Sequence, residues 1–464
     1  MSGIPTNGGL GDYQTNTDQH IVFNNVTLDN SKKYYIYIAS EYASSQPIPP
    51  LLTGYEPLFV CCVQPQYPPP NNFVYINKKE ILGEKLSHTD FFKFSMFYDL
   101  LLKSNKLQTV FKDLAKRQGN LWIKPFRNDP SFAPQFQDSH YKCLGLTSEQ
   151  SDRLNNKVFQ YLMFDRKLSL PNYKIVPAQD AENNFNNIKS SNGVFIAGAY
   201  GAGGSTTFVA KTKKELKKQL NERKFSLIEN IVLAECLDLK QSLSIDLLIA
   251  NRHEILPFCI LGQTYDENNK LECKGNAYPA NISAVMQKKV KDLAYEAGKT
   301  LAVEEGVRGH VSLDLNIDQN DEVYFGEINA RYTAATAERF LLMELTRPSG
   351  YPTLIDLEKM AIEKGTFTGL KLWKEPTSLY IKRREMQARE KGVVIVAPKD
   401  SCEDEKRIFE LRKPGIIGAL PVGKKVSTED TIGKYVAIGE TSEECDSQIK
   451  NLETQLAKSI QYKF

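Results

Sequence analysis

The stretch from Gly309 to Arg331 narrows the possible folds of this chain most, because it holds two consecutive strands that carry acidic residues. Apolar and polar residues alternate from Val311 to Ile317, which is the pattern of a strand with one polar face. A polar turn follows at Asp318–Asp321, and Val323–Ile328 returns as a second strand. We therefore expect a β-hairpin with one apolar and one polar face.

The polar face of this hairpin predicts a metal site. With a four-residue turn, Asp314 faces Phe325, and Glu327 lies one diagonal step away on the same face, about 7–8 Å between backbones. Asn329 continues that face at the strand end. Two carboxylates and an amide oxygen suit Mg²⁺ bound between protein carboxylates and nucleotide phosphates. A slip of one residue in the pairing would move Asp314 to the other face.

The alternative is that Asp314 and Glu327 decorate a solvated sheet face. Glu327 and Asn329, however, lie in an otherwise apolar strand. A lone carboxylate in such a strand is costly unless it is paired. The sequence therefore favours the metal interpretation.

A glycine-rich loop, Gly198–Thr207, follows the short apolar strand Val194–Ala197. Such loops let backbone N–H groups approach phosphate oxygens, because no Cβ blocks them. Gly198 and Gly203 have the spacing of a P-loop, but the next residue is Gly204 and not the lysine that contacts phosphate. We therefore reject a P-loop, and a hairpin rich in turn residues remains the alternative to a phosphate-binding loop.

Composition excludes several classes of protein. Hydrophobic residues make up 41% of the 464 residues and charged residues 25%, so each domain can bury a core. The net charge of +3 argues against a dedicated nucleic-acid-binding protein. No apolar run approaches the ~18 residues that span a bilayer, and the N-terminus lacks the pattern of a secretory signal. The eight cysteines form no Cys-x-x-Cys pair, which disfavours zinc and is typical of reduced thiols in a cytoplasmic protein.

Changes in pattern divide the chain into a tail and three domains. We expect a flexible tail over residues 1–20, an α/β domain over 21–146, a second domain over 147–350 and a smaller domain over 351–464. The more regular elements predicted within them are strands at 33–39, 173–176, 194–197, 231–234 and 245–250 and helices at 90–118, 150–167, 285–305 and 443–459.

Four elements of the second domain, in order, resemble the ATP-grasp superfamily. Lys157 in a helix resembles the first nucleotide-binding lysine, and Ala199–Gly204 resembles the flexible flap over the β- and γ-phosphates. Val232–Leu237 resembles the hinge strand that holds adenine, and the hairpin acids with Asn329 resemble the magnesium triad. The resemblance covers about residues 147–345. It implies an α/β (α+β) protein with the ATP-grasp fold, a pre-ATP-grasp domain before it and a small C-terminal domain after it.

The resemblance implies a site for ATP and Mg²⁺, with Mn²⁺ as a substitute. In this site Lys157 and Arg331 act on the transferring phosphate, while Asp314, Glu327 and Asn329 hold the metal ion. The other residues implied in nucleotide binding are Tyr200, Gly201, Gly203, Gly204, Ser205, Thr206, Glu235, Cys236, Leu237 and Asp238.

One position departs from the family pattern. The strand before the flap usually carries a second lysine, and here that position is Ala197, which cannot grip a phosphate. Arg153 and Lys211 are the candidates to supply the missing cation. Lys211 has a second interpretation as a solvated charge at a strand end.

Two other side chains have both a functional and a structural interpretation. Cys236 in the hinge is interpreted as a core residue and not as a nucleophile, because the implied chemistry needs no protein nucleophile. His310 precedes the acidic strand and could contact substrate, but a structural histidine with satisfied hydrogen bonds is the favoured interpretation.

The domain layout resembles carboxylate–amine ligases of the peptide-ligase type, including those similar to the pheganomycin ligase. The resemblance implies ATP-dependent, ADP-forming synthesis of an amide or peptide bond through an acyl phosphate. It implies small-molecule or peptide carboxylates and amines as partners, neither nucleic acid nor membrane, and a homodimer by analogy. An ATP-grasp kinase or carboxylase is one alternative, and a non-catalytic ATP-binding scaffold is another. The missing lysine at Ala197 favours the scaffold, and the complete metal triad opposes it.

Overall fold

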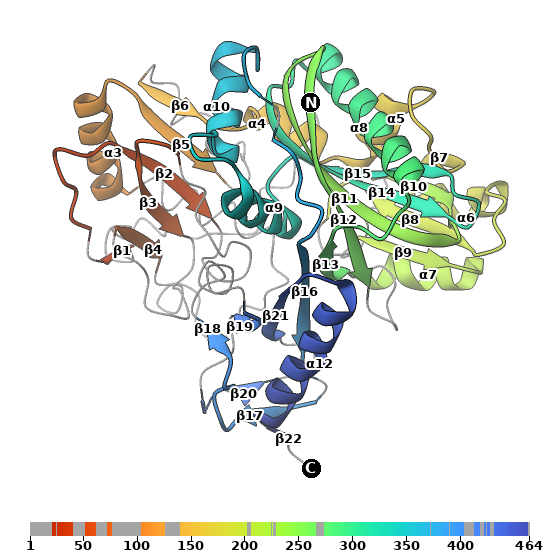
Figure 1. The fold of residues 1–464 in the computed structure, drawn as a ribbon. Coiled ribbons are helices and arrows are strands. Elements are labelled where there is room, and N and C mark those ends of the chain that lie inside the picture. The colour runs from red at the N-terminus through yellow and green to blue at the C-terminus, as the bar shows by residue number, and fades with distance from the viewer. Residues whose placement is uncertain are drawn as a thin grey trace.

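In the computed structural model the described residues form four β-sheets, which divide this part of the chain into layers (Figure 1). The predicted tail over 1–20 and residues 90–103 of the first predicted helix lie outside the described residues. The structure describes residues 21–24, 26–39, 52–61, 72–76, 104–125, 140–201, 206–223, 225, 229–265, 273–371, 373–388, 390–402, 413–417, 422–423, 425–426 and 431–462.

The N-terminal sheet has six strands in the order β1-β4-β3-β2-β5-β6, and all its pairs are parallel except β1–β4. One face packs on α3, Asn105–Gln118, which begins after Ser104 caps the backbone N–H of Leu107 and ends at Gly119 with φ 77°. Parallel strands that are buried on both faces explain the continuous apolar runs of this region. The strands are β1 Ile21–Asn24, β2 Tyr34–Ala39, β3 Glu56–Cys61, β4 Phe73–Ile76, β5 Leu121–Pro125 and β6 Tyr141–Cys143.

The predicted helix at 150–167 is wrong as a single element, because the structure has two helices there. They are α4, Ser148–Leu154, and α5, Lys157–Phe164. Asn156 breaks the helix because its side chain accepts a hydrogen bond from the backbone N–H of Phe159 and so caps a new helix. The break places Lys157 in the first turn of α5.

A small antiparallel sheet follows, in the order β7-β10-β8-β9. Its outer face packs on α6, Ala181–Asn184, and α7, Lys213–Glu222, and its inner face packs on α5. The strands are β7 Tyr173–Pro177, β8 Val194–Gly198, β9 Thr207–Ala210 and β10 Asn230–Glu235, with 3₁₀ turns at Ala178–Asp180 and Phe185–Asn187.

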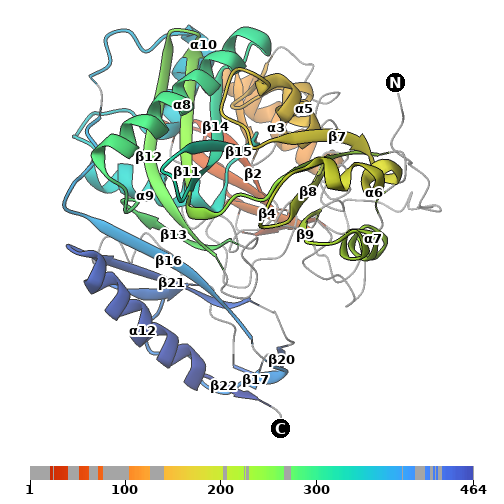
Figure 2. The same ribbon diagram turned by 90° about the vertical axis from the view of Figure 1, so that its right-hand side faces the viewer.

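A nine-stranded sheet forms the centre of the molecule, in the order β15-β14-β11-β12-β13-β16-β21-β19-β18. Helix α8, Ala284–Glu304, lies along one face, and α9, Ala334–Thr346, and α10, Leu354–Lys364, lie on the other (Figures 1 and 2). The strands are β11 Leu239–Asn251, β12 Glu254–Tyr265, β13 Cys273–Tyr278, β14 Gly309–Asp318, β15 Val323–Asn329, β16 Tyr380–Gln387, β18 Ser401–Cys402, β19 Gly415–Ile417 and β21 Thr431–Gly439.

The C-terminal residues are joined to the central sheet in two ways. Helix α10 packs between this sheet and the N-terminal sheet, where Leu354 and Leu357 share a core with Trp122 and Leu248. Strand β16 pairs with β13, so hydrogen bonds run without interruption from the acidic hairpin to β18. The expected domain boundaries stay a prediction, although α10 and β16 show that the segment from 351 onward shares a core and a sheet with earlier residues.

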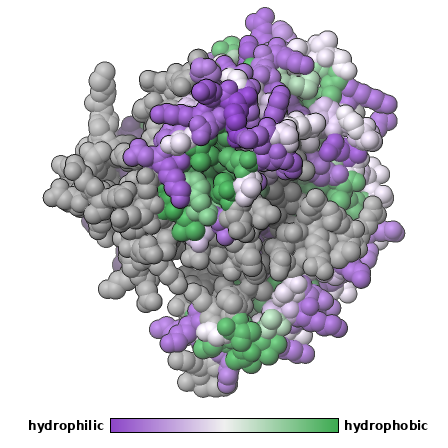
Figure 3. All heavy atoms as spheres, turned by 90° about the vertical axis from the view of Figure 1, so that its left-hand side faces the viewer, coloured by the Kyte–Doolittle hydropathy of each residue, from purple (hydrophilic) through white to green (hydrophobic). Residues whose placement is uncertain are grey.

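Helix α12, Ser442–Lys458, covers β16 and β21, beside a small sheet in the order β20-β17-β22. Figure 3 shows a hydrophobic area at this lower end of the molecule. The exposed large hydrophobic residues of this part of the chain are Ile395, Val396 and Val422. The small strands are β17 Gly392–Val394, β20 Lys425–Val426 and β22 Ile460–Tyr462.

Two properties expected from composition can be compared with the structure. Among the described residues, no helix has the length and apolar character that a membrane crossing needs. The described cysteine side chains Cys61, Cys143, Cys236, Cys259, Cys273 and Cys445 are free thiols.

A buried ionic group ties β11, β14 and α9 together. Asp246 on β11 has a fully buried side chain, and its carboxylate accepts from Arg339 Nη1 at 2.7 Å and lies 2.8 Å from His310 Nε2. Arg339 also donates from Nε to the carbonyl of Cys259 on β12 at 2.9 Å. Because the side chains of Asp246, His310 and Arg339 are almost entirely buried, each depends on the others for its polar contacts.

A second buried pair joins the N-terminal sheet to this group. Lys124 on β5 lies 2.8 Å from Glu358 on α10, and the hydroxyl of Tyr332 donates to Glu358 at 2.8 Å. The Lys124 ammonium also lies 3.9 Å from the centre of the Tyr332 ring. Tyr332 contacts His310 edge to face at 4.7 Å, so the two buried groups meet at these rings.

We predict that Asp246→Asn lowers the free energy of unfolding by about 3–5 kcal/mol, because it leaves the Arg339 charge without its anion. Burial acts to raise the pKa of Asp246, but Arg339 and His310 hold it at about 2, below its ordinary 3.8. A depressed carboxyl pKa stabilises the fold above the unfolded value, so this stability should be lost as pH falls from about 4 towards about 2. Urea unfolding at about pH 7 and about pH 3 measures both effects.

Asp292→Asn is the matched control, because Asp292 forms an exposed pair with Lys288. It should change stability by less than about 0.5 kcal/mol. Equal effects of the two substitutions would contradict a special role for the buried group.

Candidate active site

Lys157 connects the inner side of the small sheet to the acidic hairpin. It is the first residue of α5, and its backbone N–H donates to the carbonyl of Ala199 at 2.7 Å. Its ammonium lies 2.5 Å from Glu327 Oε2, and the two side chains are 12% and 30% exposed. Two contacts of this single residue therefore fix the start of the flap, α5 and β15 relative to one another.

The hairpin pairs differently from the predicted register. Leu315 faces Phe325, and Asp314 faces Glu327 directly, with a β-bulge at Gly326 between the two pairs. The predicted pairing of Asp314 with Phe325 is wrong by two residues, one at the turn and one at the bulge. The extra residue of the bulge turns Glu327 to the polar face, because Phe325 and Ile328 both point into the apolar core against α8.

The bulge brings the three predicted metal ligands together. Asn329 Nδ2 lies 3.1 Å from Asp314 Oδ2 and 3.4 Å from Glu327 Oε1. Gln263 on β12 donates to the other oxygen of Asp314 at 2.9 Å, and Tyr265 donates to Gln263 Oε1 at 2.7 Å. Each carboxylate of the triad is therefore oriented by at least one neighbouring side chain.

The pKa values of the two carboxylates are shifted in opposite directions. Burial and the Glu327 carboxylate raise the pKa of Asp314 to about 7. Burial also acts to raise the pKa of Glu327, but the Lys157 ammonium beside it and, after it, Arg331 outweigh that effect and lower the pKa. The site therefore concentrates negative charge that two cationic side chains already offset in part.

The donor set fits a magnesium ion. Asp314, Glu327 and Asn329 offer only hard oxygen atoms, if the Asn329 amide presents its oxygen to the cation. That amide now points its nitrogen at both carboxylates, and rotation by half a turn would point the oxygen there. Among the described residues no cluster of three or more His, Cys, Asp or Glu side chains suits a metal. A metal site here therefore needs Asn329 as its third ligand.

The described residues at the two ends of the glycine-rich loop lie close together. Thr206 donates from Oγ1 to the carbonyl of Tyr200 at 2.7 Å, and a Cβ on Gly201 would lie 2.0 Å from that hydroxyl oxygen. Tyr200 also reaches Asp152 Oδ2 at 3.4 Å. The predicted contact residues Gly203, Gly204 and Ser205 lie outside the described residues.

The predicted hinge joins the small sheet to the central sheet. Glu235 ends β10, and the backbone N–H of Cys236 donates to the carbonyl of Gly193 at 3.2 Å. Leu237 is half-buried and Asp238 is exposed, with its carbonyl bonded to the backbone N–H of Gln319 at 3.1 Å. Burial raises the pKa of the Cys236 thiol, which favours the structural interpretation of this cysteine.

Ala197 stands where the second lysine is missing, and this position is not accessible to a cation. Ala197 is fully buried against Val158 and Tyr161 of α5. Neither proposed substitute replaces it in this structure. Arg153 pairs with Glu305 at 2.8 Å, and Lys211 follows Ala210, which pairs with Val194 at the opposite end of β8 from Ala197. Lys211 is exposed at that strand end, as its alternative interpretation predicted.

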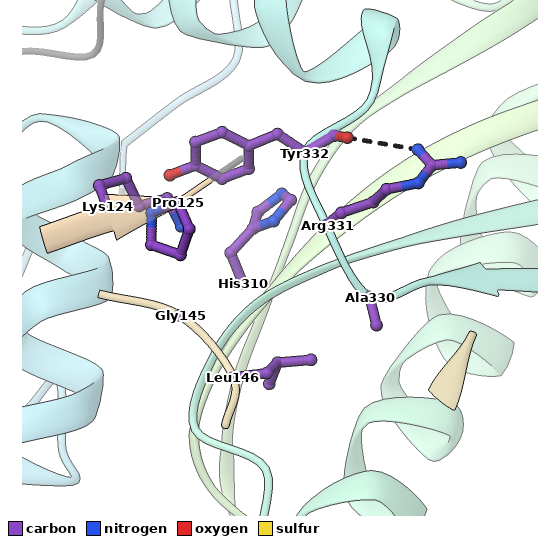
Figure 4. Close-up of a pocket in the computed structure, with 8 residues that line it drawn as sticks. All are labelled: Lys124, Pro125, Gly145, Leu146, His310, Ala330, Arg331 and Tyr332. Atoms are coloured by element: carbon purple, nitrogen blue, oxygen red, sulfur yellow. Dashed lines mark hydrogen bonds between the residues drawn. The ribbon is translucent and has the colours of Figure 1, made fainter. Parts of the chain in front are cut away.

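A small pocket opens beside the triad, between the central sheet and the carboxyl ends of β5 and β6 (Figure 4). Arg331 and Tyr332 line it directly after the triad strand, and Figure 4 shows the rings of Tyr332 and His310 close together there. Arg331 donates from Nη1 to the carbonyl of Tyr332 at 3.3 Å. Its full lining is Lys124, Pro125, Gly145, Leu146, His310, Ala330, Arg331 and Tyr332.

Several residues of this region were missed from the sequence. Lys124 is a lone charge in the apolar strand Leu121–Pro125, the same signal that marked Glu327, and could have been found that way. Gln263 and Tyr265 had no such signal, because they reach Asp314 only through the pairing of β12 with β11 and of β11 with β14. Arg339 was also missed; it is buried on α9 and donates a hydrogen bond to Asp246.

Comparison with known proteins identifies the fold of this site. Residues 154–335 match the family model described as the ATP-grasp domain. This chain has the ATP-grasp fold. The expected fold class is therefore confirmed. No curated protein matches the chain in sequence.

Solved ATP-grasp structures match most of the chain at low identity. The L-amino acid ligase from Bacillus licheniformis is 12% identical with a TM-score of 0.64, over 93% of this chain and 99% of that chain. N5-carboxyaminoimidazole ribonucleotide synthetase from Thermotoga maritima is 13% identical with a TM-score of 0.56, over 92% and 99%. The biotin carboxylase domain dimer of Hydrogenobacter thermophilus 2-oxoglutarate carboxylase, solved with MgADP, ADP and bicarbonate, is 12% identical with a TM-score of 0.54, over 78% and 79%.

Likeness at this level shows the ATP-grasp fold and leaves the reaction open. The three proteins are by their titles a ligase, a synthetase and a carboxylase. None of these findings bears on the expected likeness to the pheganomycin ligase group, which stays a prediction. The choice of reaction therefore rests on the residues of this chain.

We predict that Gly326→Ala weakens both the fold and nucleotide binding. A Cβ at this position would lie 2.8 Å from the carbonyl oxygen of Asp314, so the bulge must shift and carry Glu327 with it. We expect a loss of about 1–3 kcal/mol in unfolding free energy and a weaker affinity for a non-hydrolysable ATP analogue with Mg²⁺ by titration calorimetry.

Gly54→Ala serves as the control, because Gly54 has φ +80° and no atom within 4 Å of an added Cβ. It should cost about 1 kcal/mol of stability from backbone strain alone and leave the nucleotide affinity unchanged. An unchanged affinity in Gly326→Ala would show that the bulge does not set the position of Glu327.

Proposed function

We propose that this chain is an ATP-dependent, ADP-forming ligase that joins a carboxylate to an amine through an acyl phosphate. The observation that carries the proposal is the convergence of Lys157 and Asn329 on Glu327, with Asp314 bonded to the same amide. A scaffold has little use for two half-buried carboxylates oriented in this way, because removing them even partly from water costs stability.

The proposed roles follow from the positions of the side chains. Lys157 and Arg331 offset negative charge on the transferring phosphate, and the flap and hinge residues from Tyr200 to Thr206 and from Glu235 to Asp238 hold the nucleotide. Asp314, Glu327 and Asn329 would hold Mg²⁺, or Mn²⁺ in its place, which when bound neutralises phosphate charge. Chemistry of this kind depends on orientation and charge and needs no protein nucleophile.

The substrates in this proposal are small-molecule or peptide carboxylates and amines, handled in the cytoplasm, with a homodimer as the expected assembly. The L-amino acid ligase among the similar structures is consistent with an amide product, and the carboxylase keeps a carboxylation reaction open as the second candidate. A kinase would share the first step and release a phosphorylated product. A non-catalytic binder would bind ATP without turnover.

Product analysis distinguishes these reactions. The purified protein is incubated with ATP, Mg²⁺, pooled amino acids and small polyamines, and nucleotides and new masses are measured together. ADP with a mass equal to acid plus amine minus water supports the ligase. ADP with a phosphorylated product supports a kinase, and bicarbonate-dependent ADP formation supports a carboxylase. Binding without turnover supports the scaffold.

We predict that Glu327→Gln abolishes acid-dependent ADP formation and leaves the fold intact. The substitution keeps the shape of the side chain and removes the charge that faces Lys157 and the proposed metal ion. Turnover should fall by at least about 100-fold. Glu322→Gln is the matched control, because Glu322 lies on the same hairpin with a 63% exposed side chain. Undiminished ADP formation by Glu327→Gln would rule out this site.

We predict that Lys157→Ala raises the KM for ATP by about 10-fold or more, because it removes a cation from the nucleotide phosphates. Steady-state kinetics at varied ATP concentration measures the change. Lys289→Ala is the control, since Lys289 pairs with exposed Glu322 at 3.8 Å on the far end of the hairpin. Identical KM values for Lys157→Ala and the unchanged protein would remove Lys157 from the site.

A further inference from the structure

We propose that His310 is the general base that takes the proton from the attacking amine. The proposal rests on the ligase function above and assigns a residue to its second step. His310 was favoured as a structural histidine from sequence, but it lines the pocket beside Arg331 (Figure 4).

Asp246 orients the imidazole. His310 Nε2 lies 2.8 Å from Asp246 Oδ2, and the other oxygen of Asp246 is held by Arg339 at 2.7 Å. Arg339 leaves Asp246 ionised, so the carboxylate accepts and Nε2 must donate. The hydrogen therefore sits on Nε2, and Nδ1 keeps the lone pair that a base needs.

Packing holds the ring in one orientation. Tyr332 meets it edge to face, with ring centres 4.7 Å apart and planes at 82°. Tyr332 is fixed in turn by its bond to Glu358 and by Lys124 over its ring. A base held by two independent groups requires little reorganisation at the moment of reaction.

Arg331 places the ring near the reacting centre. Ala330, Arg331 and Tyr332 line the pocket and follow the triad residue Asn329 directly in the chain. Arg331 connects the triad and the pocket, since it lowers the pKa of Glu327 in the triad and also lines the pocket with His310. The pocket beside His310 has room for about one water molecule, so an amine that attacks a carboxyl group activated beside the triad would pass its proton to His310 through that water.

The attack of the amine on the acyl phosphate forms one bond and breaks another. The amine nitrogen forms a bond to the acyl carbon, the bond from that carbon to the phosphate oxygen breaks, and inorganic phosphate leaves. The proton on nitrogen passes to His310 Nδ1 and later to solvent. No oxidant, reductant or further reactant is needed.

Charged and polar groups from five elements face His310. They are Asp246 on β11, Arg339 on α9, Lys124 on β5, Glu358 on α10, and Arg331 and Tyr332 after β15. A purely structural histidine could share this environment, so the test separates the amine step from the phosphate step.

The first experiment compares His310→Gln with the unchanged protein, using two nucleophiles. Gln keeps a donor for Asp246 and cannot act as a base. Pooled amino acids serve as acids, and either pooled amino acids or hydroxylamine serves as the nucleophile. Hydroxylamine is a strong nucleophile that is largely unprotonated near neutral pH, so it depends little on a protein base.

We expect amide formation to fall by about 100-fold in His310→Gln, while acid-dependent hydroxamate and ADP formation stay within about twofold. His253→Gln, on the exposed turn between β11 and β12, is the matched control and should change neither product. Equal losses of amide and hydroxamate would overturn the proposal, as would unchanged amide formation.

The second experiment needs no substrate. Nitrogen-15 NMR of labelled histidine in the full chain reports which ring nitrogen of His310 carries the hydrogen. We expect Nε2–H with Nδ1 unprotonated, and a change of tautomer in Asp246→Asn. An Nδ1–H tautomer in the unchanged protein would overturn the proposal. Absence of ADP in any reaction would count against the ligase function instead, and an Nδ1–H tautomer would still overturn the role of the ring as a base.

Discussion

The bulge at Gly326 is the constraint on which the site depends. A regular hairpin would place Glu327 on the same face as Phe325, in the apolar core under α8. The extra residue lets Phe325 and Ile328 stay in that core while Glu327 turns towards Asp314 and Lys157. A glycine is needed there because the carbonyl of Asp314 occupies the space that a Cβ would take. A single residue without a side chain therefore allows this strand to pack apolar residues into the core on one face and to present a carboxylate on the other.

Two buried ion pairs of this protein lie at contacts between its layers. Lys124 and Glu358 join the N-terminal sheet to α10, and Asp246 and Arg339 join β11 to α9. Such pairs add little net stability compared with apolar residues, but a partner left alone is costly. They therefore penalise any arrangement in which the layers shift relative to one another, and they surround the pocket beside Arg331.

Local signals predicted much of this structure. Alternation predicted both strands of the acidic hairpin, and the apolar spacing from Val285 to Glu305 predicted helix α8. The grouping of Asp314, Glu327 and Asn329 on one face was also expected, although by a register that is wrong at the turn. Contacts set by long-range pairing could not be predicted. Gln263 reaches Asp314 because β12 and β14 flank β11, and Lys124 meets Tyr332 because two sheets pack together. The break at Asn156 was missed because two asparagines in a helical pattern are compatible with one helix until the cap forms.

The pairing of β13 with β16 has a consequence for the integrity of the chain. Strand β13 also pairs with β12, and β16 also pairs with β21, so neither is an edge of the central sheet. A protein that ended before Tyr380 would expose the outer side of β13, with its unpaired N–H and C=O groups, as a template for another chain. Loss of the C-terminal segment would then promote aggregation through the central sheet. The acidic hairpin would still be present in such a protein.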